Sequence, residues 1–228
     1  MKNPFSELSK SEWVIYIVSL VVVIVSNLFG KHIDYMNMIS TVLGVTSLIF
    51  IAKGNVWGQI ISLPFVTMYA IISFMERYYG EVIICLTLSI PLAVFSIVTW
   101  VKNPYKKGEN VVKVALISLK EKVFLFFLDV AIVVVFYFIL QALGTNNLIV
   151  STISVGTSFC ASYLMIRRNS FYAIAFTLND VVLIVLWVMA SIADPINIPM
   201  VACFSMFLFN DLYGFIRWRK REKEQGIR

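Results

Sequence analysis

The sequence has few charged residues. Asp, Glu, Lys and Arg make up 14% of its 228 residues, whereas 60% are apolar and the mean hydropathy is +0.86. Ordinary globular domains are about half apolar and about a quarter charged. The composition therefore excludes a soluble domain and predicts a membrane protein.

Residue types that commonly build catalytic and metal sites are also scarce. The chain has one histidine, His32, and three cysteines, Cys85, Cys160 and Cys203, which lack CxxC spacing. The cysteines lie inside apolar runs, so we interpret them as packing residues. No HExxH, GxSxG or Walker A motif occurs. We therefore expect a protein that is not an enzyme and that has neither a cofactor nor a bound metal.

Apolar runs long enough to cross a bilayer recur along the chain. The hydrocarbon layer is about 30 Å thick and requires about 20 helical residues. None of the runs has the period-2 alternation of a membrane β-barrel. We expect an all-α, polytopic membrane protein with eight transmembrane helices, at residues 12–29, 36–52, 57–75, 80–101, 123–143, 147–166, 171–191 and 197–217.

The positions of Lys and Arg predict the orientation in the membrane. With eight spans, seventeen of the 19 basic residues fall on one side and only Lys31 and Arg77 on the other. Because basic loops stay in the cytoplasm, both termini are expected to be cytoplasmic. We interpret the basic tail, 219–228, as an anchor on anionic lipid and not as a nucleic-acid site.

Three pairs of short segments resemble each other in the same order along the chain, as internal repeats do. The offsets between the paired segments are 111, 114 and 118 residues. Each set of matches spans three predicted helices, so the pattern predicts two copies of a three-helix unit. The pairs are STVLGVTS (40–47) with STISVGTS (151–158), AKGN (52–55) with IRRN (166–169), and FSIVTWVK (95–102) with YGFIRWRK (213–220).

An extra helix between two three-helix units gives both units the same orientation. The expected architecture is 1+(3+1+3), with parallel repeats related by an axis along the membrane normal. Substrate sites in such transporters lie between the repeats near the midplane. The expected parts are an N-terminal segment with an extra helix (1–35), the first repeat (36–103), a basic loop with the linker helix (104–146), the second repeat (147–218) and the tail (219–228).

Asn179 and Asp180 lie near the middle of the predicted helix 171–191. A carboxylate at that depth costs several kcal/mol unless it faces protein or water. This favours a functional site. The alternative, in which both residues only hydrogen-bond neighbouring helices, stays open.

Aromatic side chains share the faces of this helix with the polar pair. Tyr172, Phe176 and Asn179 form one stripe by helical spacing, and Asp180 and Trp187 lie on the neighbouring one. Rings with an amide suit a flat heterocycle, which stacks on the rings and is oriented by the amide. We therefore predict a substrate site on this helix.

Two other helices provide further candidates. Gln59, Ser62 and Tyr69 form a polar and aromatic stripe on the third predicted helix, where packing is an equal alternative. Asn210 and Tyr213 on the last helix are expected to line the cytoplasmic half of the site. All five are candidate substrate-binding residues.

The last helix carries a recognisable pattern. Its residues Asn210 to Trp218, NDLYGFIRW, resemble the NxxYG…W pattern of the PnuC family of bacterial vitamin transporters. Asn169 followed by Asn179 is similar to the pore-lining helix of that family. The resemblance covers residues 36–222 and leaves the first helix as an addition.

The resemblance implies a function and a location. It implies import of nicotinamide riboside, or of a closely related nucleoside-like vitamin, by facilitated diffusion and alternating access, with trapping by a cytoplasmic kinase. It also implies a multi-pass protein of the bacterial inner (cytoplasmic) membrane. The expected partners are a small molecule and the lipid bilayer, with no nucleic acid. The oligomeric state stays open, with a homo-oligomer as one option.

One departure from the family widens the choice of cargo. Members that carry nicotinamide riboside have a WxxW pair before the central Asn, where this chain has Tyr172 and Ala175. Relatives without that pair are thought to carry other cargo, so deoxynucleosides, other nucleosides and thiamine are alternatives, with proton coupling as an option.

Two functions outside transport also stay open. The carboxylates Asp129, Asp180 and Asp211 within apolar runs would be compatible with a membrane enzyme. A non-transporting subunit of a larger complex is the other option. Two related halves argue against the subunit, because they naturally build a central path. For a transporter, Pro64 and Pro91 would interrupt their helices and allow a hinge.

Overall fold

The computed structural model describes residues 4–28, 34–106 and 110–227. In these ranges the chain forms helices and two isolated β-bridges, without a strand. The prediction of an all-α protein is therefore confirmed. The helices are η1 (Pro4–Glu7), α1 (Lys10–Ser26), α2 (Tyr35–Ala52), α3 (Val56–Met75), α4 (Tyr79–Ile84), the π-helical turn η2 (Cys85–Ser89), α5 (Ile90–Lys102), α6 (Leu119–Ala142), α7 (Leu148–Ile166), α8 (Tyr172–Ala193), η3 (Pro195–Asn197) and α9 (Ile198–Glu224).

Each of the eight predicted spans overlaps one of these helical segments. Among the described residues, seven segments are long and apolar enough to cross a membrane, and α4, η2 and α5 together form one of them. The eighth, α1, has 17 residues and is about 25 Å long at about 1.5 Å per residue. Its outer face exposes Val14, Ile17, Val18 and Val21, which suits contact with lipid.

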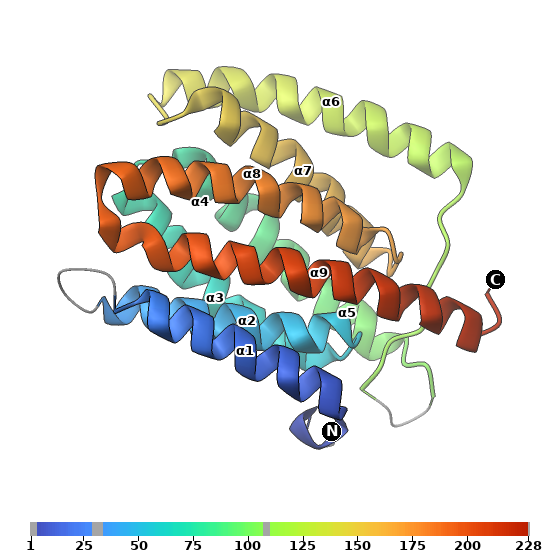
Figure 1. The fold of residues 1–228 in the computed structure, drawn as a ribbon. Coiled ribbons are helices and arrows are strands. Elements are labelled where there is room, and N and C mark those ends of the chain that lie inside the picture. Colours follow the sequence, from blue (N-terminus) through green and yellow to red (C-terminus); the bar gives the residue numbers. More distant parts are fainter. Residues whose placement is uncertain (1–3, 29–33, 107–109, 228) are drawn as a thin grey trace.

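The helices form an elongated bundle with α8 and α9 in its middle (Figure 1). The first helix, α1, packs on α2 and α9 along one edge. The predicted linker helix, α6, covers α7 along the opposite edge. Only Leu125 and Leu140 of α6 are buried, so most of this helix faces outward.

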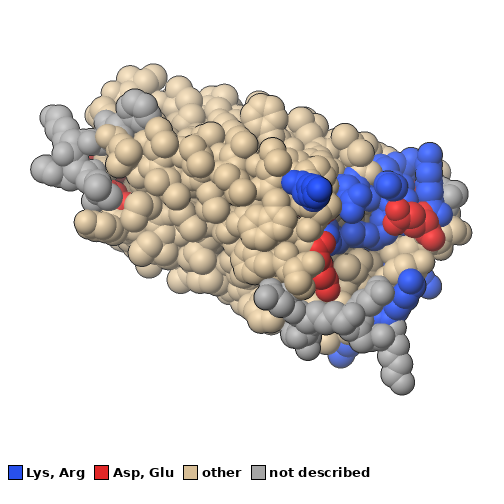
Figure 2. Space-filling view, turned by 60° about the horizontal axis from the view of Figure 1, so that its bottom comes forward, with Lys and Arg blue, Asp and Glu red and all other residues tan. Residues whose placement is uncertain are grey.

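Both chain ends lie at the same end of the bundle (Figure 1). Lys and Arg gather at one end of the surface, while the middle of the visible face carries almost no charge (Figure 2). The helix α9 continues through the predicted tail as far as Glu224. Glu222 in that extension is buried, pairs with Arg219 and accepts a hydrogen bond from Ser170. The tail is therefore largely helical and packed, because its charged side chains find partners on the protein.

The turns after α2 and α7 have the same geometry. Gly54 and Arg168 both adopt a left-handed backbone, with φ of 64° and 56°. The next residue in each turn is an asparagine, Asn55 or Asn169. Its side-chain oxygen accepts a hydrogen bond from the backbone N–H two residues on, at 3.0 and 3.1 Å. The segments AKGN and IRRN thus have one local structure as well as a similar sequence.

Two tryptophans connect the halves reciprocally at the charged end. Trp218 donates from Nε1 to the carbonyl oxygen of Ile51 at the end of α2, at 3.2 Å. Trp100 donates to the carbonyl oxygen of Met165 at the end of α7, at 3.4 Å. The two fully buried indole rings meet with centroids 5.7 Å apart. Each predicted repeat therefore supplies an indole donor to a carbonyl at the end of the first helix of the other, in addition to the turn N–H that this carbonyl already accepts.

Glycines in the two matching segments permit close helix contacts. A Cβ atom on Gly44 of α2 would lie 2.8 Å from Cζ of Phe207, and one on Gly156 of α7 would lie 2.6 Å from Cγ2 of Val133. In either case the neighbouring side chain would have to shift. Both helices therefore approach their neighbours closely at a glycine.

The two prolines differ in their effect on the backbone. Pro64 lies within α3, which continues without interruption. Pro91 lies at the start of α5, directly after η2, so the predicted helix 80–101 is divided there. The predicted interruption is confirmed at Pro91 and wrong at Pro64, because a membrane helix can tolerate one missing backbone hydrogen bond.

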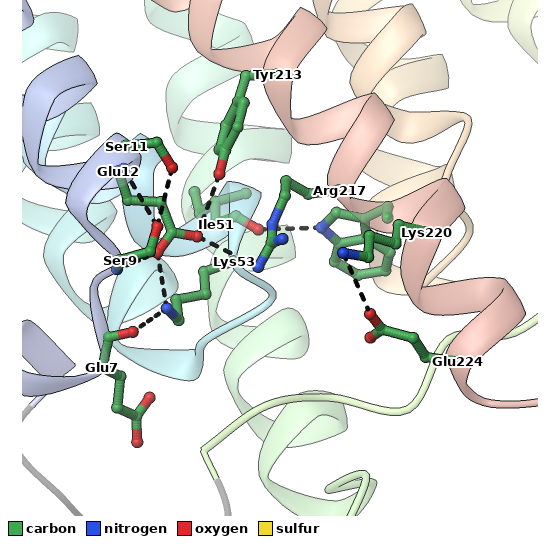
Figure 3. A network of polar contacts seen from close by, with 11 residues as sticks. Glu7, Ser9, Ser11, Glu12, Ile51, Lys53, Tyr213, Arg217, Lys220 and Glu224 are labelled. Atoms are coloured by element: carbon green, nitrogen blue, oxygen red, sulfur yellow. Dashed lines mark hydrogen bonds and ion pairs between the residues drawn. The ribbon is translucent and has the colours of Figure 1, made fainter.

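A polar cluster attaches α1 to the bundle at the charged end (Figure 3). Glu12 is buried and closes a capping box with Ser9. Its carboxylate pairs with Lys53 at 2.8 Å and with Arg217 at 3.5 Å, and it accepts a hydrogen bond from the Tyr213 hydroxyl at 3.3 Å. Glu12 thereby joins α1, the turn after α2 and α9.

Candidate functional site

A cavity of about 140 Å³ lies between helices of the two predicted repeats. Its volume would hold on the order of ten water molecules. The lining residues come from α2, α3, α4, η2, α5, α7, α8 and α9. The cavity therefore occupies the position where the sequence places a substrate site.

Asn179 is held in the cavity wall by α7. Its Oδ1 accepts hydrogen bonds from Oγ1 of Thr157 at 2.7 Å and from Oγ of Ser158 at 2.9 Å. The two hydroxyls belong to the end of the segment STISVGTS. They fix the carboxamide with its oxygen toward α7.

Asp180 and Asp211 bring two carboxyl groups together in the same wall. Both are buried and line the cavity, one from α8 and one from α9. The two carboxyl groups are neighbours across the contact between α8 and α9. Oδ2 of Asp180 has no hydrogen-bond partner.

A third carboxylate, Glu81 of α4, lines the cavity and is bound by protein hydroxyls. It accepts hydrogen bonds from Ser154 and, at 3.2 Å, from Tyr69. The Tyr69 oxygen in turn accepts a hydrogen bond from Nε1 of Trp187 at 3.2 Å. This chain connects α7, α4, α3 and α8 along one side of the cavity.

Four aromatic rings form a closed cluster on the cavity wall. Phe65 and Tyr69 of α3 stack with centroids 5.9 Å apart. Phe204 and Phe207 of α9 complete the cluster at centroid distances of 5.3 to 5.4 Å. Phe176 of α8 also lines the cavity. Aromatic surface is therefore present although the WxxW pair is missing.

Six of the ten residues predicted for the site line the cavity, from α3 and α8. Gln59 donates from Nε2 to the sulfur of Met165 at 2.8 Å, and Ser62 donates to the carbonyl oxygen of Gln59. The six are Gln59, Ser62, Tyr69, Phe176, Asn179 and Asp180.

The other four lie outside the lining. Trp187 is behind Tyr69, as its hydrogen bond shows. Tyr172 packs edge-on against Trp218 with centroids 4.9 Å apart, and its hydroxyl donates to the carbonyl oxygen of Ile51 at 3.4 Å. It therefore belongs to the tryptophan contacts at the charged end.

Asn210 and Tyr213 face α1 and not the cavity. Nδ2 of Asn210 lies 3.3 Å from Oγ of Ser19, and Tyr213 donates to Glu12. On α9 the cavity face is formed by Phe204, Phe207 and Asp211, which follow i, i+3, i+7 spacing. The structure therefore turns the two predicted residues away, because positions 210 and 213 belong to other faces of the same helix.

The sequence reasoning missed Glu81 and the hydroxyls that hold the polar groups. Glu81 is the second residue of a predicted span, where a carboxylate resembles an ordinary interfacial residue. Thr157 and Ser158 were noted only as part of a repeat. The available signal was that hydroxyl residues recur at 151, 154 and 158 with helical spacing, which predicts one polar face of this helix.

The remaining sequence candidates lie elsewhere. Asp129 of α6 is near Gly156 of α7 and does not line the cavity. Cys85 lines it, whereas Cys160 and Cys203 do not, and all three are free thiols. His32 lies outside the described residues. Within the described ranges, no three His, Cys, Asp or Glu side chains are grouped as metal ligands would be.

Known proteins resemble this chain over most of its length. A family described as nicotinamide mononucleotide transporter matches residues 34–220. The nicotinamide riboside transporter PnuC of Neisseria mucosa is 24% identical over 198 residues, which are 85% of this chain and 75% of that protein. The protein of the same name from Haemophilus influenzae is 24% identical over 192 residues, which are 83% of this chain and 81% of that protein.

A solved structure shares the fold. The crystal structure of the vitamin B3 transporter PnuC matches with a TM-score of 0.83 at 22% identity. The match covers 96% of this chain and 94% of that chain. It therefore includes nearly all of the helices described above.

Proposed function

Since the chain belongs to the nicotinamide mononucleotide transporter family, which includes the PnuC transporters, we propose that it imports nicotinamide riboside or a closely related nucleoside-like vitamin. The observation that carries the proposal is the cavity between the predicted repeats. It combines a fixed amide, carboxyl groups and aromatic rings, as binding a small heterocyclic glycoside requires.

The charge of the cavity favours the riboside over the mononucleotide. The lining contains Glu81, Asp180 and Asp211, and none of the described lining residues is Lys, Arg or His. The phosphate of a mononucleotide would meet carboxyl groups and no cation from the described lining residues, which is unfavourable. A riboside lacks that phosphate.

Cargo contacts are assigned as follows. Asn179 hydrogen-bonds the base or the ribose, because its amide is already oriented by α7. Phe176 and the aromatic cluster of α3 and α9 pack against the rings. Gln59 and Ser62 provide polar contacts on the α3 side. Tyr172 and Trp187 do not line the cavity, and they act by positioning the residues that they contact.

The transport mechanism is facilitated diffusion by alternating access, with two parallel repeats in a 1+(3+1+3) arrangement. The matching turns after α2 and α7 and the reciprocal tryptophan bonds support this arrangement. The path between the cavity and the charged end would be closed by Trp100, Trp218 and Tyr172. These residues bind the carbonyls of Ile51 and Met165, which line the cavity.

We propose that both termini lie in the cytoplasm of a bacterium. The end of the molecule that carries the termini also carries most of the Lys and Arg, which favours the cytoplasmic side (Figures 1 and 2). A cytoplasmic kinase would trap the cargo by phosphorylation, since the product would gain the phosphate that the cavity disfavours.

Thiamine or a deoxynucleoside is the alternative cargo, and proton coupling is the alternative mechanism. The observation that favours this alternative is the absence of the WxxW pair. Tyr172 and Ala175 occupy its two positions, and neither lines the cavity. Either cargo would use the same cavity.

Uptake into liposomes that contain only this protein tests the proposal. Labelled nicotinamide riboside should equilibrate, and a proton ionophore should leave that equilibrium unchanged. Unlabelled riboside should compete and the mononucleotide should not. Flux of thiamine or a deoxynucleoside without flux of the riboside would move the assignment to the alternative. No flux of any of these compounds would contradict transport by this chain alone.

A further inference from the structure

Residues 110–115 cross the charged end of the bundle on the way from α5 to α6 (Figure 1). They form no helix, and Val111 and Val112 make isolated β-bridges. Val112 and Val114 are buried, at 0% and 3% exposure, whereas Lys113 between them is exposed. This alternation is typical of an extended backbone that packs on the protein with one face. We call residues 110–115 the strap.

The strap binds the same backbone position in the two predicted repeats. The N–H of Val112 donates to the carbonyl oxygen of Gly54 at 3.0 Å. The N–H of Ala115 donates to the carbonyl oxygen of Arg168, also at 3.0 Å. Gly54 and Arg168 are the left-handed residues of the matching turns after α2 and α7. Because three residues extend over at most about 11 Å, the two turns cannot move far apart while both bonds hold.

Backbone bonds attach the strap to the first predicted repeat. The N–H of Val56, at the start of α3, donates to the carbonyl oxygen of Asn110 at 3.1 Å. The N–H of Lys113 donates to the carbonyl oxygen of Asn103, directly after α5, at 2.9 Å. Together with the bond to Gly54, these contacts connect the strap to α3, to the end of α5 and to the turn after α2.

Side-chain amides supply most of the bonds between the strap and the second predicted repeat. Gln225, directly after α9, accepts a hydrogen bond from the N–H of Val114 at 2.9 Å and donates to the carbonyl oxygen of Val112 at 3.4 Å. Asn169 donates from Nδ2 to the carbonyl oxygen of Ala115 at 3.1 Å. A side-chain amide can rotate and exchange these partners for water, whereas a backbone group moves only with its segment. The second repeat is therefore the side from which the strap can detach.

We propose that the strap holds the cytoplasmic ends of the two predicted repeats together, and that it detaches from the second repeat each time the cytoplasmic side opens. The inference rests on the proposed transport by alternating access, in which these ends separate once in each cycle. It goes beyond that proposal by assigning a conformational role to a loop outside the cavity and to Gln225 in the predicted tail. While the strap is bound at both turns, cargo in the cavity cannot leave toward the cytoplasm.

Reversible cross-linking tests whether the strap has to detach from the end of α9. The double variant Val114→Cys/Gln225→Cys is joined by a short methanethiosulfonate cross-linker, between two residues that are hydrogen-bonded in the wild type. Uptake of labelled nicotinamide riboside into liposomes is measured before cross-linking, after it, and after reduction. Cross-linking should remove most of the uptake and reduction should restore it. Binding of the riboside to the purified, cross-linked protein should persist, because the cavity is unchanged.

The matched control is the double variant Asn103→Cys/Lys113→Cys. Its cross-link joins the strap to the end of α5 within the first repeat, so uptake should stay unchanged. Full uptake by the protein cross-linked to the end of α9 would overturn the role of the strap. Loss of uptake in both cross-linked variants would overturn detachment from the second repeat. Absence of uptake by wild type would instead contradict the proposed function.

Gln225→Ala tests the strap without a cross-linker. The variant loses two hydrogen bonds to the strap, so the cytoplasmic side should open more often. With Cys160 and Cys203 replaced by alanine, an impermeant thiol reagent on the cytoplasmic side should label Cys85 of the cavity on the order of tenfold faster, as two lost hydrogen bonds imply. Lys223→Ala, at an exposed position two residues earlier, is the control and should be labelled at the wild-type rate. An unchanged rate in Gln225→Ala would overturn the proposed role of the strap.

Discussion

The side chain of Asn179 has a fixed orientation and also lines the cavity in which cargo would bind. Its oxygen accepts two hydroxyl groups from α7, which determines the orientation of the whole carboxamide in the cavity wall. Oγ1 of Thr157 also lies 3.1 and 3.2 Å from the carbonyl oxygens of Ile153 and Ser154, and either can accept its one proton when the asparagine is absent. Ser158 lines the cavity and can bond to water there. The local structure therefore depends only weakly on this amide, whereas cargo binding is expected to depend on it directly if Asn179 contacts the cargo as proposed.

Asn179→Ala should reduce cargo affinity more than stability. Loss of an oriented hydrogen bond to the cargo should raise the Kd on the order of tenfold, because a buried unpaired group on the cargo costs about 1–3 kcal/mol. The thermal unfolding midpoint should change little. Thr177→Ala on the same helix is the control, since Thr177 bonds only to the carbonyl oxygen of Ala173 and does not line the cavity. Normal cargo binding by Asn179→Ala would remove Asn179 from the site.

At the scale of helices, one carboxylate at the charged end joins α1 to two other elements. Glu12 is buried and Lys53 is 12% exposed, so their ion pair is screened far less than a surface pair. Arg217 and Tyr213 approach the same carboxylate from α9 (Figure 3). Farther along α1, Tyr16 bonds to Thr46 of α2 at 3.0 Å. Glu12 is therefore the point where α1, α2 and α9 are joined.

Glu12→Gln should destabilise the protein by about 1–3 kcal/mol. Removing one member of a fully buried pair costs about 3–5 kcal/mol, and the partial exposure of Lys53 and Arg217 reduces that cost. A lower apparent Tm in detergent is the expected result. Glu224→Gln removes an exposed i, i+4 partner of Lys220 and should leave the Tm unchanged. Equal shifts in the two variants would show that α1 is not held by this carboxylate.

Helix positions were predictable because long apolar runs dominate the sequence. The predicted span 36–52 corresponds to α2 within one residue. The end of α9 was placed too early, at 217, because the helix continues through charged residues whose partners are distant in sequence, as for Glu222 and Ser170.

The cavity face was predictable on α3 and not on α9. On α3 a single polar stripe contains Gln59, Ser62 and Tyr69, so helical spacing alone identifies the face. On α9 polar residues occupy several faces, and periodicity cannot decide between Asn210 and Asp211. That choice depends on the packing of α1, which no local pattern encodes.

At the scale of the whole molecule, the two halves meet at the charged end through Trp100 and Trp218. Each indole donates to the first helix of the other half, and Tyr172 covers the same contact from α8. The carbonyls they bind belong to Ile51 and Met165, which line the cavity. If the halves rock to open the cytoplasmic side, these bonds must break together. We propose this contact as a gate whose two sides would be related by the predicted repeat.

Trp218→Ala should open the cavity toward the cytoplasm. Cys85 lines the cavity and is buried, so its thiol can report access when Cys160 and Cys203 are replaced by alanine. In inside-out vesicles, a membrane-impermeant thiol reagent should label Cys85 several-fold faster in the variant, because the variant loses the indole that packs on Trp100 and bonds to the Ile51 carbonyl. Labelling from the opposite side should not increase.

Trp13→Ala on the exposed face of α1 is the control and should change neither rate. Unchanged labelling of Trp218→Ala from the cytoplasmic side would show that the path is closed elsewhere, and a rise from both sides would indicate loosening of the fold and not a gate between the halves.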